Sequence, residues 1–277
     1  MDNLASYGEF FSLLGEYTPM TLLTLFFLAC ARLIPVVVFA PFFGAKLPSG
    51  VKMGLVVSLA VIILPYMVVN SKGVPNFTLE YFILFMKEFF IGFVLALLIS
   101  VPFYVALSAG SLIDFIRGSS SLQVSDPTSQ EQTSPIGILY NYVLIVIFYA
   151  MNGPLLFLES FMDTYNIIPP DTMINPIFFD TNFPVWTLIS AVLAKVFALA
   201  IQLSAPCLLA VLMTEVFLGI ANRLAPQVQI VFLGMSLKSL IGLAILCAAW
   251  SFIIQQMGKE TFLWMKEVNK VFQTLPH

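Results

Sequence analysis

The chain has 277 residues, of which 60% are hydrophobic and only 10% are charged, with a formal net charge of −3. A soluble globular domain normally carries roughly 25% charged residues, so this composition excludes a water-soluble protein and predicts an integral membrane protein made of α-helices. The charges are spread thinly and form no basic stretch, which excludes a nucleic-acid-binding protein.

Hydrophobic segments follow one another along the whole chain. A helix needs about 20 apolar residues to cross a hydrocarbon core of roughly 30 Å. The runs that approach or exceed this length are 20–43, 53–69, 81–109, 136–161, 185–220 and 229–254. They predict about six hydrophobic helices, and the tail at 259–277 is expected to form a short amphipathic helix.

Three of these runs need a more specific interpretation. The first has no basic residue before Arg32, unlike the leader of a cleaved signal peptide, so we expect it to be retained. The fifth run, 185–220, is too long for one straight span and contains Pro206, so we expect it to be kinked or divided. Pro102 in the third run allows an ordinary kink or a broken helix that lines a pore.

The intervals between the runs differ in character. The interval 44–52 is a Gly/Pro turn, 162–184 is acidic, and 225–227 is a tight turn that contains Pro226 and Gln227. Basic residues in alternate loops indicate a cytoplasmic side for those loops and place both termini outside, but three lysines in the tail oppose this orientation. The orientation therefore stays open.

Residues that catalyse reactions are scarce. The only histidine is His277, and no nucleophile elbow, phosphate-binding loop or dinucleotide fingerprint is present. Three cysteines lie inside apolar runs and are expected to be free thiols; they are Cys30, Cys207 and Cys247. We therefore expect no enzyme activity, no metal and no cofactor.

Charged side chains inside the apolar runs are more informative, because each costs about 2.5 to 3.5 kcal/mol at the centre of an inserted helix. Such intramembrane charges are Arg32, Lys87, Glu88, Lys195, Glu215 and Lys238. Their cost predicts that they have partners inside the protein or in a neighbouring subunit.

Two sets of these charges allow predictions about their partners. Glu215 and Lys238 lie nearly equidistant from the turn at 225–227, so an antiparallel hairpin brings them to similar depth. A structural ion pair is the favoured interpretation, and a contact to another subunit or a proton-linked site is the alternative. Lys87 and Glu88 are neighbours and are not expected to face each other on a helix, so one needs a partner elsewhere.

Arg32 is followed by Pro35 and Pro41. Backbone carbonyls freed near the prolines are expected to accept hydrogen bonds from its guanidinium. A functional role for Arg32 is an equal alternative.

The interval 117–134 is the most polar stretch between two spans and shows no periodicity. A surface connection is one interpretation. Loops longer than about 12 to 15 residues are often lids or binding loops, which is the other. Asp114 and Arg117 are close enough to its beginning to anchor it.

Three stretches, taken in order, resemble the FliR/YscT/SpaR family of type III export apparatus proteins. They are ARLIPVVVFAPFFGAKLPSGVKMGL, GSLIDFIRGSSSLQVSDP followed by SPIG, and EVFLGIANRLAPQVQIVFLGMSLKSLIGL. The matching positions are Arg32, Pro35, Pro41, Gly44, Pro48, Lys52 and Gly54 in the first, Gly110, Asp114, Gly118, Asp126, Pro127, Ser134 and Pro135 in the second, and Glu215, Pro226, Gln227, Lys238 and Gly242 in the third.

The resemblance implies a single-copy subunit that joins other small helical membrane proteins in a hetero-oligomeric pore in the bacterial inner membrane. It implies that 1–184 resembles one partner subunit, that 185–258 is a final hairpin resembling another, and that 259–277 is a tail. It also implies that a loop at 118–133 plugs the closed pore through which unfolded proteins are secreted. The plug residues carried over are Gly118, Ser119, Ser120, Ser121, Asp126 and Pro127.

A stand-alone solute transporter or channel in the lipid bilayer is the competing interpretation. Within the family, a virulence injectisome is favoured over a flagellar apparatus.

Overall fold

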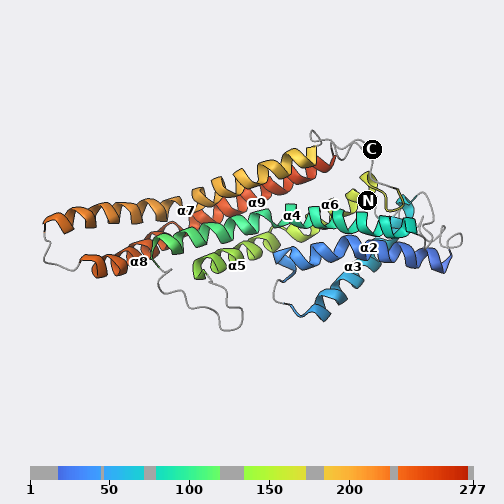
Figure 1. Cartoon of the computed structure of the whole chain (residues 1–277), viewed down its shortest axis with the longest axis horizontal. Coiled ribbons are helices and arrows are strands. Elements are labelled where there is room, and N and C mark those ends of the chain that lie inside the picture. Colours follow the sequence, from blue (N-terminus) through green and yellow to red (C-terminus); the bar gives the residue numbers. More distant parts are fainter. Residues whose placement is uncertain are drawn as a thin grey trace. The chain divides into compact units, whose positions relative to one another are not determined.

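The computed structural model describes residues 18–44, 47–71, 79–118, 134–172, 184–224 and 230–273. Every regular element in these ranges is a helix, as Figure 1 shows, and this confirms the predicted all-α fold. In chain order they are α2 (Pro19–Phe39), the 3-10 helix η1 (Pro41–Phe43), α3 (Ser49–Asn70), α4 (Leu79–Ile116), α5 (Pro135–Ala150), α6 (Gly153–Ile167), α7 (Pro184–Leu224), α8 (Ile230–Ala248) and α9 (Trp250–Gln273).

The helices are long and apolar enough for a multi-pass membrane protein. Four of them, α2, α3, α4 and α7, qualify as single spans by length and composition. Two bent pairs, α5 with α6 and α8 with α9, raise the number to six if each pair is one span. The prediction of about six hydrophobic helices is confirmed in this sense.

The chain divides into two compact units. The first contains α2, α3, the part of α4 up to Ser100, and α6. The second contains α4 from Val101, α5, α7 from Ser190, α8, and α9 up to Trp264. Pro102 therefore follows directly after the point where α4 passes from one unit to the other.

The segment predicted as the fourth span is bent in the middle. Helices α5 and α6 meet at an angle of 73°. Between them Asn152 has a φ of 55°, in the left-handed region that asparagine tolerates better than most residues. Pro154 follows at the start of α6, where its missing N–H costs nothing. Asn152 and the sequence Gly-Pro after it thus end one helix and begin the next.

The amphipathic tail helix is longer than predicted. It begins at Trp250 rather than 259, and it bends away from α8 by 64°. Of the apolar residues near its start, which suggested a continuation of the sixth span, Ile253 belongs to its buried face, whereas Phe252 is exposed. That face continues at helical spacing and comprises Ile253, Met257, Thr261, Trp264 and Val268.

The fifth run was expected to be kinked or divided, and it is not divided, because α7 is one helix of 41 residues with Pro206 inside it. Proline is tolerated in such helices when neighbouring hydroxyl groups bond to the backbone. Ser204, two residues before Pro206, donates to the carbonyl of Ala200 at 2.8 Å, whereas the carbonyl that Pro206 leaves without its usual donor is that of Gln202.

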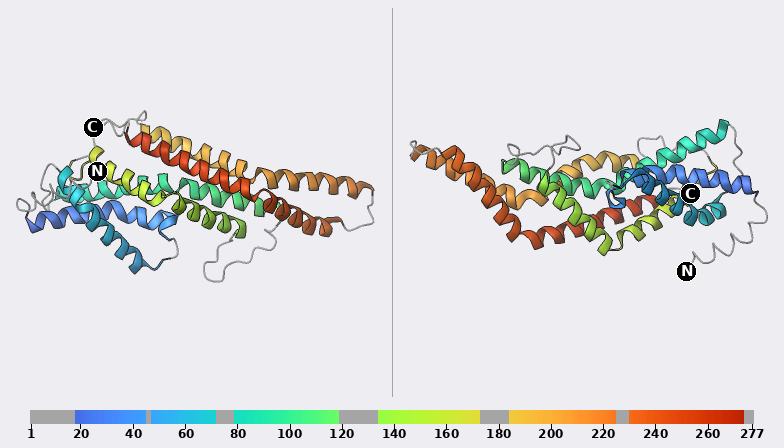
Figure 2. Two further views of the ribbon diagram at one scale, coloured as in Figure 1. Left: turned by 180° about the vertical axis from the view of Figure 1, so that it is seen from behind. Right: turned by 90° about the horizontal axis from the view of Figure 1, so that it is seen from below.

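Helices α2 and α4 approach each other closely in the first unit, while α3 packs against α2 and α6 (Figure 2). The close point is Gly92 of α4, where an added Cβ would lie 2.1 Å from the carbonyl oxygen of Arg32. Since the obstacle is backbone, it cannot rotate away as a side chain can. Only glycine fits at this position.

We therefore expect Gly92→Ala to destabilise the protein by at least about 2 kcal/mol, because α2 and α4 must separate. Gly54→Ala in α3 is the matched control, since its added Cβ meets no atom within 4 Å. Thermal unfolding of the two purified variants in detergent micelles measures the difference. Equal unfolding temperatures would contradict the close packing of α2 against α4.

Candidate functional site

A buried ion pair joins α2 to α4 in the first unit. Arg32 Nε lies 2.5 Å from Glu88 Oε2, and its Nη2 lies 2.9 Å from Oε1 of the same carboxylate. Both side chains are fully buried, with 0% exposure. This two-point contact fixes the orientation as well as the distance of the two groups.

The Arg32 guanidinium also holds the end of α6. It donates to Thr164 Oγ1 at 2.8 Å and to the carbonyl of Ile168 at 3.0 Å, and it lies 3.9 Å from the ring centre of Tyr165. The expectation that carbonyls freed near Pro35 accept its hydrogen bonds is therefore wrong. A carboxylate that accepts two bonds is the stronger partner, and it draws the guanidinium away from its own helix.

Lys87 belongs to the same cluster, which corrects the prediction that it cannot face Glu88. Its Nζ lies 2.9 Å from Glu88 Oε1. Neighbouring residues point about 100° apart on a helix, but a lysine side chain is long and flexible enough to bend back when both are buried. The other part of the prediction holds, since Glu88 has a partner elsewhere in Arg32.

Arg32 and Lys87 share the carboxylate of Glu88, and backbone oxygens also accept hydrogen bonds from the two cations. Lys87 Nζ donates to the carbonyls of Pro169, Pro170 and Thr172 at 2.8 to 3.1 Å. These residues directly follow α6, whose carboxyl end carries partial negative charge. The cluster thus serves as a C-terminal cap for α6, supplied by two other helices.

No sequence motif pointed to Thr164, Tyr165 or Ile168 as partners of Arg32. They lie in the interval where no motif was recognised, more than 130 positions from Arg32. The available signal was the helical spacing of the buried Phe157, Phe161 and Thr164, which continues α6 beyond the predicted span.

A second polar centre lies in the second unit, where α4 ends and α5 begins (Figure 1). Asp114 Oδ1 accepts a bond from Arg117 Nη2 at 2.5 Å. Its Oδ2 accepts from Ser134 Oγ at 2.5 Å and from the backbone N–H of Ile136 at 2.9 Å. One carboxylate thus binds residues on both sides of the interval 118–133, and we call these four residues the Asp114 clamp.

Three further features lie at the base of the loop. An added Cβ at Gly110 would lie 2.4 Å from Gly137 Cα, so α4 and α5 are in backbone contact there. Ser134 caps α5 by accepting the N–H of Gly137 at 3.0 Å. Gly118 has a φ of 79° and ends the turn after α4. The other predicted plug residues lie outside the described ranges; they are Ser119, Ser120, Ser121, Asp126 and Pro127.

The charges of the final hairpin are in contact. Lys238 Nζ of α8 lies 2.5 Å from Glu215 Oε1 of α7. Their side chains are 26% and 44% exposed, and they line an open groove with Gly219 and Gly234. The turn residues Pro226 and Gln227 lie outside the described part of the chain. The pair is thus accessible to a neighbouring molecule, unlike the Arg32 cluster.

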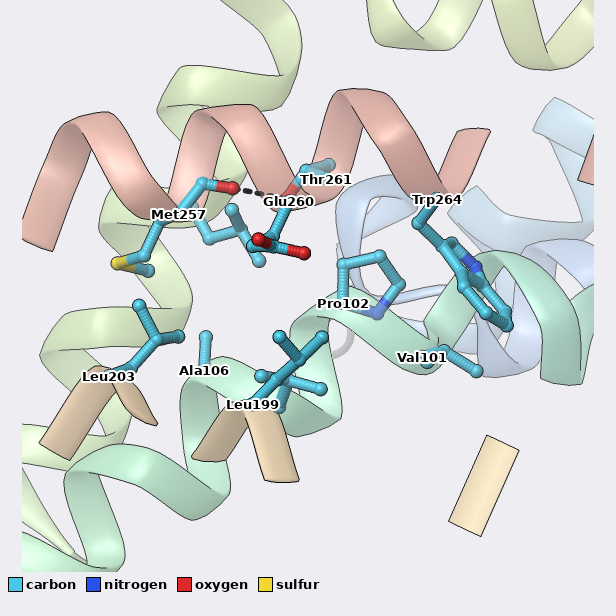
Figure 3. A pocket seen from close by; sticks show the side chains of 11 residues that line it. Val101, Pro102, Ala106, Leu199, Leu203, Met257, Glu260, Thr261 and Trp264 are labelled. Carbon is cyan, nitrogen blue, oxygen red and sulfur yellow. Dashed lines mark hydrogen bonds between the residues drawn. The ribbon is translucent and has the colours of Figure 1, made fainter. Parts of the chain in front are cut away.

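Lys195, the remaining intramembrane charge, lies with its Nζ 4.8 Å from the ring centre of Trp264. Trp264 also lines a small, mainly apolar pocket in the second unit, together with Pro102 and Glu260 (Figure 3). Within the described residues no three side chains of the metal-binding types come together. These arrangements provide packing and ion pairing, and they contain no nucleophile with an activating base.

Comparison with known proteins gives a match to the family model described as "Bacterial export proteins, family 1", over residues 23–263. The chain is 28% identical to the surface presentation of antigens protein SpaR of Shigella sonnei, over 78% of this chain and 80% of that protein. It is 29% identical to the Yop proteins translocation protein T of Yersinia pestis, over 92% and 94%. It is 24% identical to the flagellar biosynthetic protein FliR of Escherichia coli, over 82% and 84%.

The buried cluster predicts a large effect of removing the carboxylate that Arg32 and Lys87 share. Glu88→Gln removes the charge that both buried cations contact, and we expect a loss of about 3 to 5 kcal/mol of stability. Glu80→Gln, on the exposed first turn of the same helix, should cost less than about 1 kcal/mol. Thermal unfolding of the two variants in detergent micelles measures the difference in stability. A Glu88→Gln variant as stable as the Glu80→Gln control would show that the charge of Glu88 does not stabilise the fold.

Proposed function

We propose a function in protein export for this chain, which belongs to the bacterial export proteins, family 1. Its relatives are named as secretion apparatus, translocation and flagellar biosynthetic proteins. The chain is a subunit of the type III protein export gate. Its apolar helices make it a multi-pass membrane protein, and the membrane that fits this function is the bacterial inner membrane.

The finer assignment is to a channel that the chain forms with other small helical membrane subunits, one copy of this chain in each assembly. The half-exposed pair of Glu215 and Lys238 supports it, because charges on an apolar hairpin are costly toward lipid and tolerable against a polar neighbour. In this proposal 1–184 corresponds to one partner subunit and 185–258 to another. The role is conducting and sealing, without catalysis.

The plug at 118–133 is the part of the proposal that the Asp114 clamp supports most directly. The interval is polar, so it tolerates the water of a pore, and it carries no apolar stripe that would pack it into the helices. A segment that obstructs a channel must be tethered at both ends to stay at the opening. Asp114 provides this tether, since it binds Arg117 before the interval and Ser134 after it.

Deleting 118–133 should open the channel to ions. We expect conductance through the assembled complex in lipid vesicles to rise by roughly tenfold. This corresponds to a loss of about 1.4 kcal/mol in the free energy that favours the closed state. The control is the wild-type complex at the same amount of assembled protein, measured in vesicles of the same composition. Unchanged conductance at equal assembly would rule out the plug.

Reversing the charges of the hairpin tests the proposed contact with a neighbouring subunit. Glu215→Lys and Lys238→Glu each place two like charges side by side, and we expect each to reduce co-purification of the other membrane subunits several-fold. The double reversal restores the pair and should restore assembly. If each single reversal assembles like the wild type, the pair does not contribute to the interface.

A further inference from the structure

Arg117, the cationic member of the Asp114 clamp, also lies against helix α8. Its side chain is only 8% exposed, and its Nη2 binds Asp114. Its Nε is buried and makes no hydrogen bond. The guanidinium is thus held in place by one strong bond to the clamp and by packing around its aliphatic part.

The aliphatic part of the Arg117 side chain packs against the backbone of α8 at Gly242. A Cβ added at Gly242 would lie 2.9 Å from both Cγ and Cδ of Arg117, and 3.4 Å from Val211 Cγ2 of α7. Real Cβ atoms essentially never come within 3.0 Å of another heavy atom. The stem of Arg117 therefore occupies the space that any side chain at position 242 would need. A displacement of α8 toward α4 at this point must displace Arg117 as well.

Displacing Arg117 weakens the clamp. Asp114 is 1% exposed, and Arg117 is its cationic partner in the clamp. A buried carboxylate that loses its counter-charge is strongly destabilised. The same carboxylate binds Ser134 Oγ and the N–H of Ile136, so its rearrangement loosens the attachment of the far end of the interval.

We propose that Arg117 is a positioning residue that couples helix α8 to both ends of the interval 118–133. It rests against Gly242 on one side and holds Asp114 on the other, so the position of α8 sets the strength of the clamp. This inference rests on the proposed function, because it describes how the plug is held. It adds a contact through which the position of α8 acts on the residues that flank the interval.

The test is Gly242→Ala in the assembled complex, with ion conductance in lipid vesicles normalised to the amount of complex. We expect conductance to rise by roughly tenfold. Gly258→Ala in α9 is the matched control, because its added Cβ would be 3.4 Å from Ile147 Cγ2, an ordinary contact. It should leave conductance unchanged.

A double-mutant cycle separates coupling through Arg117 from general damage to packing. Arg117→Ala should itself raise conductance, and it also removes the stem that an alanine at position 242 would strike. We therefore expect Gly242→Ala to add nothing in the Arg117→Ala background. Additive effects of the two substitutions would overturn the proposal.

Comparing the deletion of 118–133 with Gly242→Ala distinguishes the coupling through Arg117 from the plug itself. If deletion of 118–133 opens the channel and Gly242→Ala does not, the plug stands and the coupling through Arg117 is wrong. If the deletion has no effect, the plug itself fails. The second readout then decides whether the clamp responds to α8 at all.

That second readout is hydrogen exchange of the Ile136 amide, whose N–H binds Asp114 directly. It should accelerate several-fold in Gly242→Ala complexes and stay unchanged in Gly258→Ala complexes. It also applies to the purified chain if Gly242→Ala reduces assembly. Unchanged exchange in a folded Gly242→Ala protein would contradict the coupling.

Discussion

The bidentate ion pair of Arg32 and Glu88 is the interaction on which the first unit depends. It joins α2 to α4, and through Thr164 and Ile168 it also holds the end of α6. Burying these ions is costly, so the arrangement is stable only because nearly every donor has an acceptor. Lys87 and three backbone carbonyls complete this balance. The geometry of the three helices is therefore specified by charge as much as by apolar packing.

The two groups of intramembrane charges differ in their environments, and this difference is informative. Arg32 and Glu88 are fully buried. Glu215 and Lys238 form an equally short pair but remain 44% and 26% exposed. The first arrangement is complete within the described chain, whereas the second leaves polar atoms facing outward from an apolar hairpin. An enclosed pair contributes to folding, and an open pair is suited to association.

Sequence reasoning succeeded where the pattern is local. Runs of apolar residues predicted the helices, and the symmetric spacing around 225–227 predicted that Glu215 and Lys238 would meet. It failed for Arg32, because its partner Glu88 is 56 positions away and its acceptors on α6 are farther still. It also failed for Lys87 and Glu88, since the rule that neighbours diverge on a helix describes the directions of Cβ atoms and not the reach of long side chains. The bend at Asn152 was readable in the sequence Asn-Gly-Pro but was hidden within a continuous apolar run.

The backbone contact of Gly110 with Gly137 gives the second unit a practical property. Together with the hydrogen bond from Ser134 to Asp114, it joins α4 to α5 through groups that lie outside the interval 118–133. The two helices are thus held to each other independently of the sequence of that interval, which leaves this sequence free to serve a purpose other than stability.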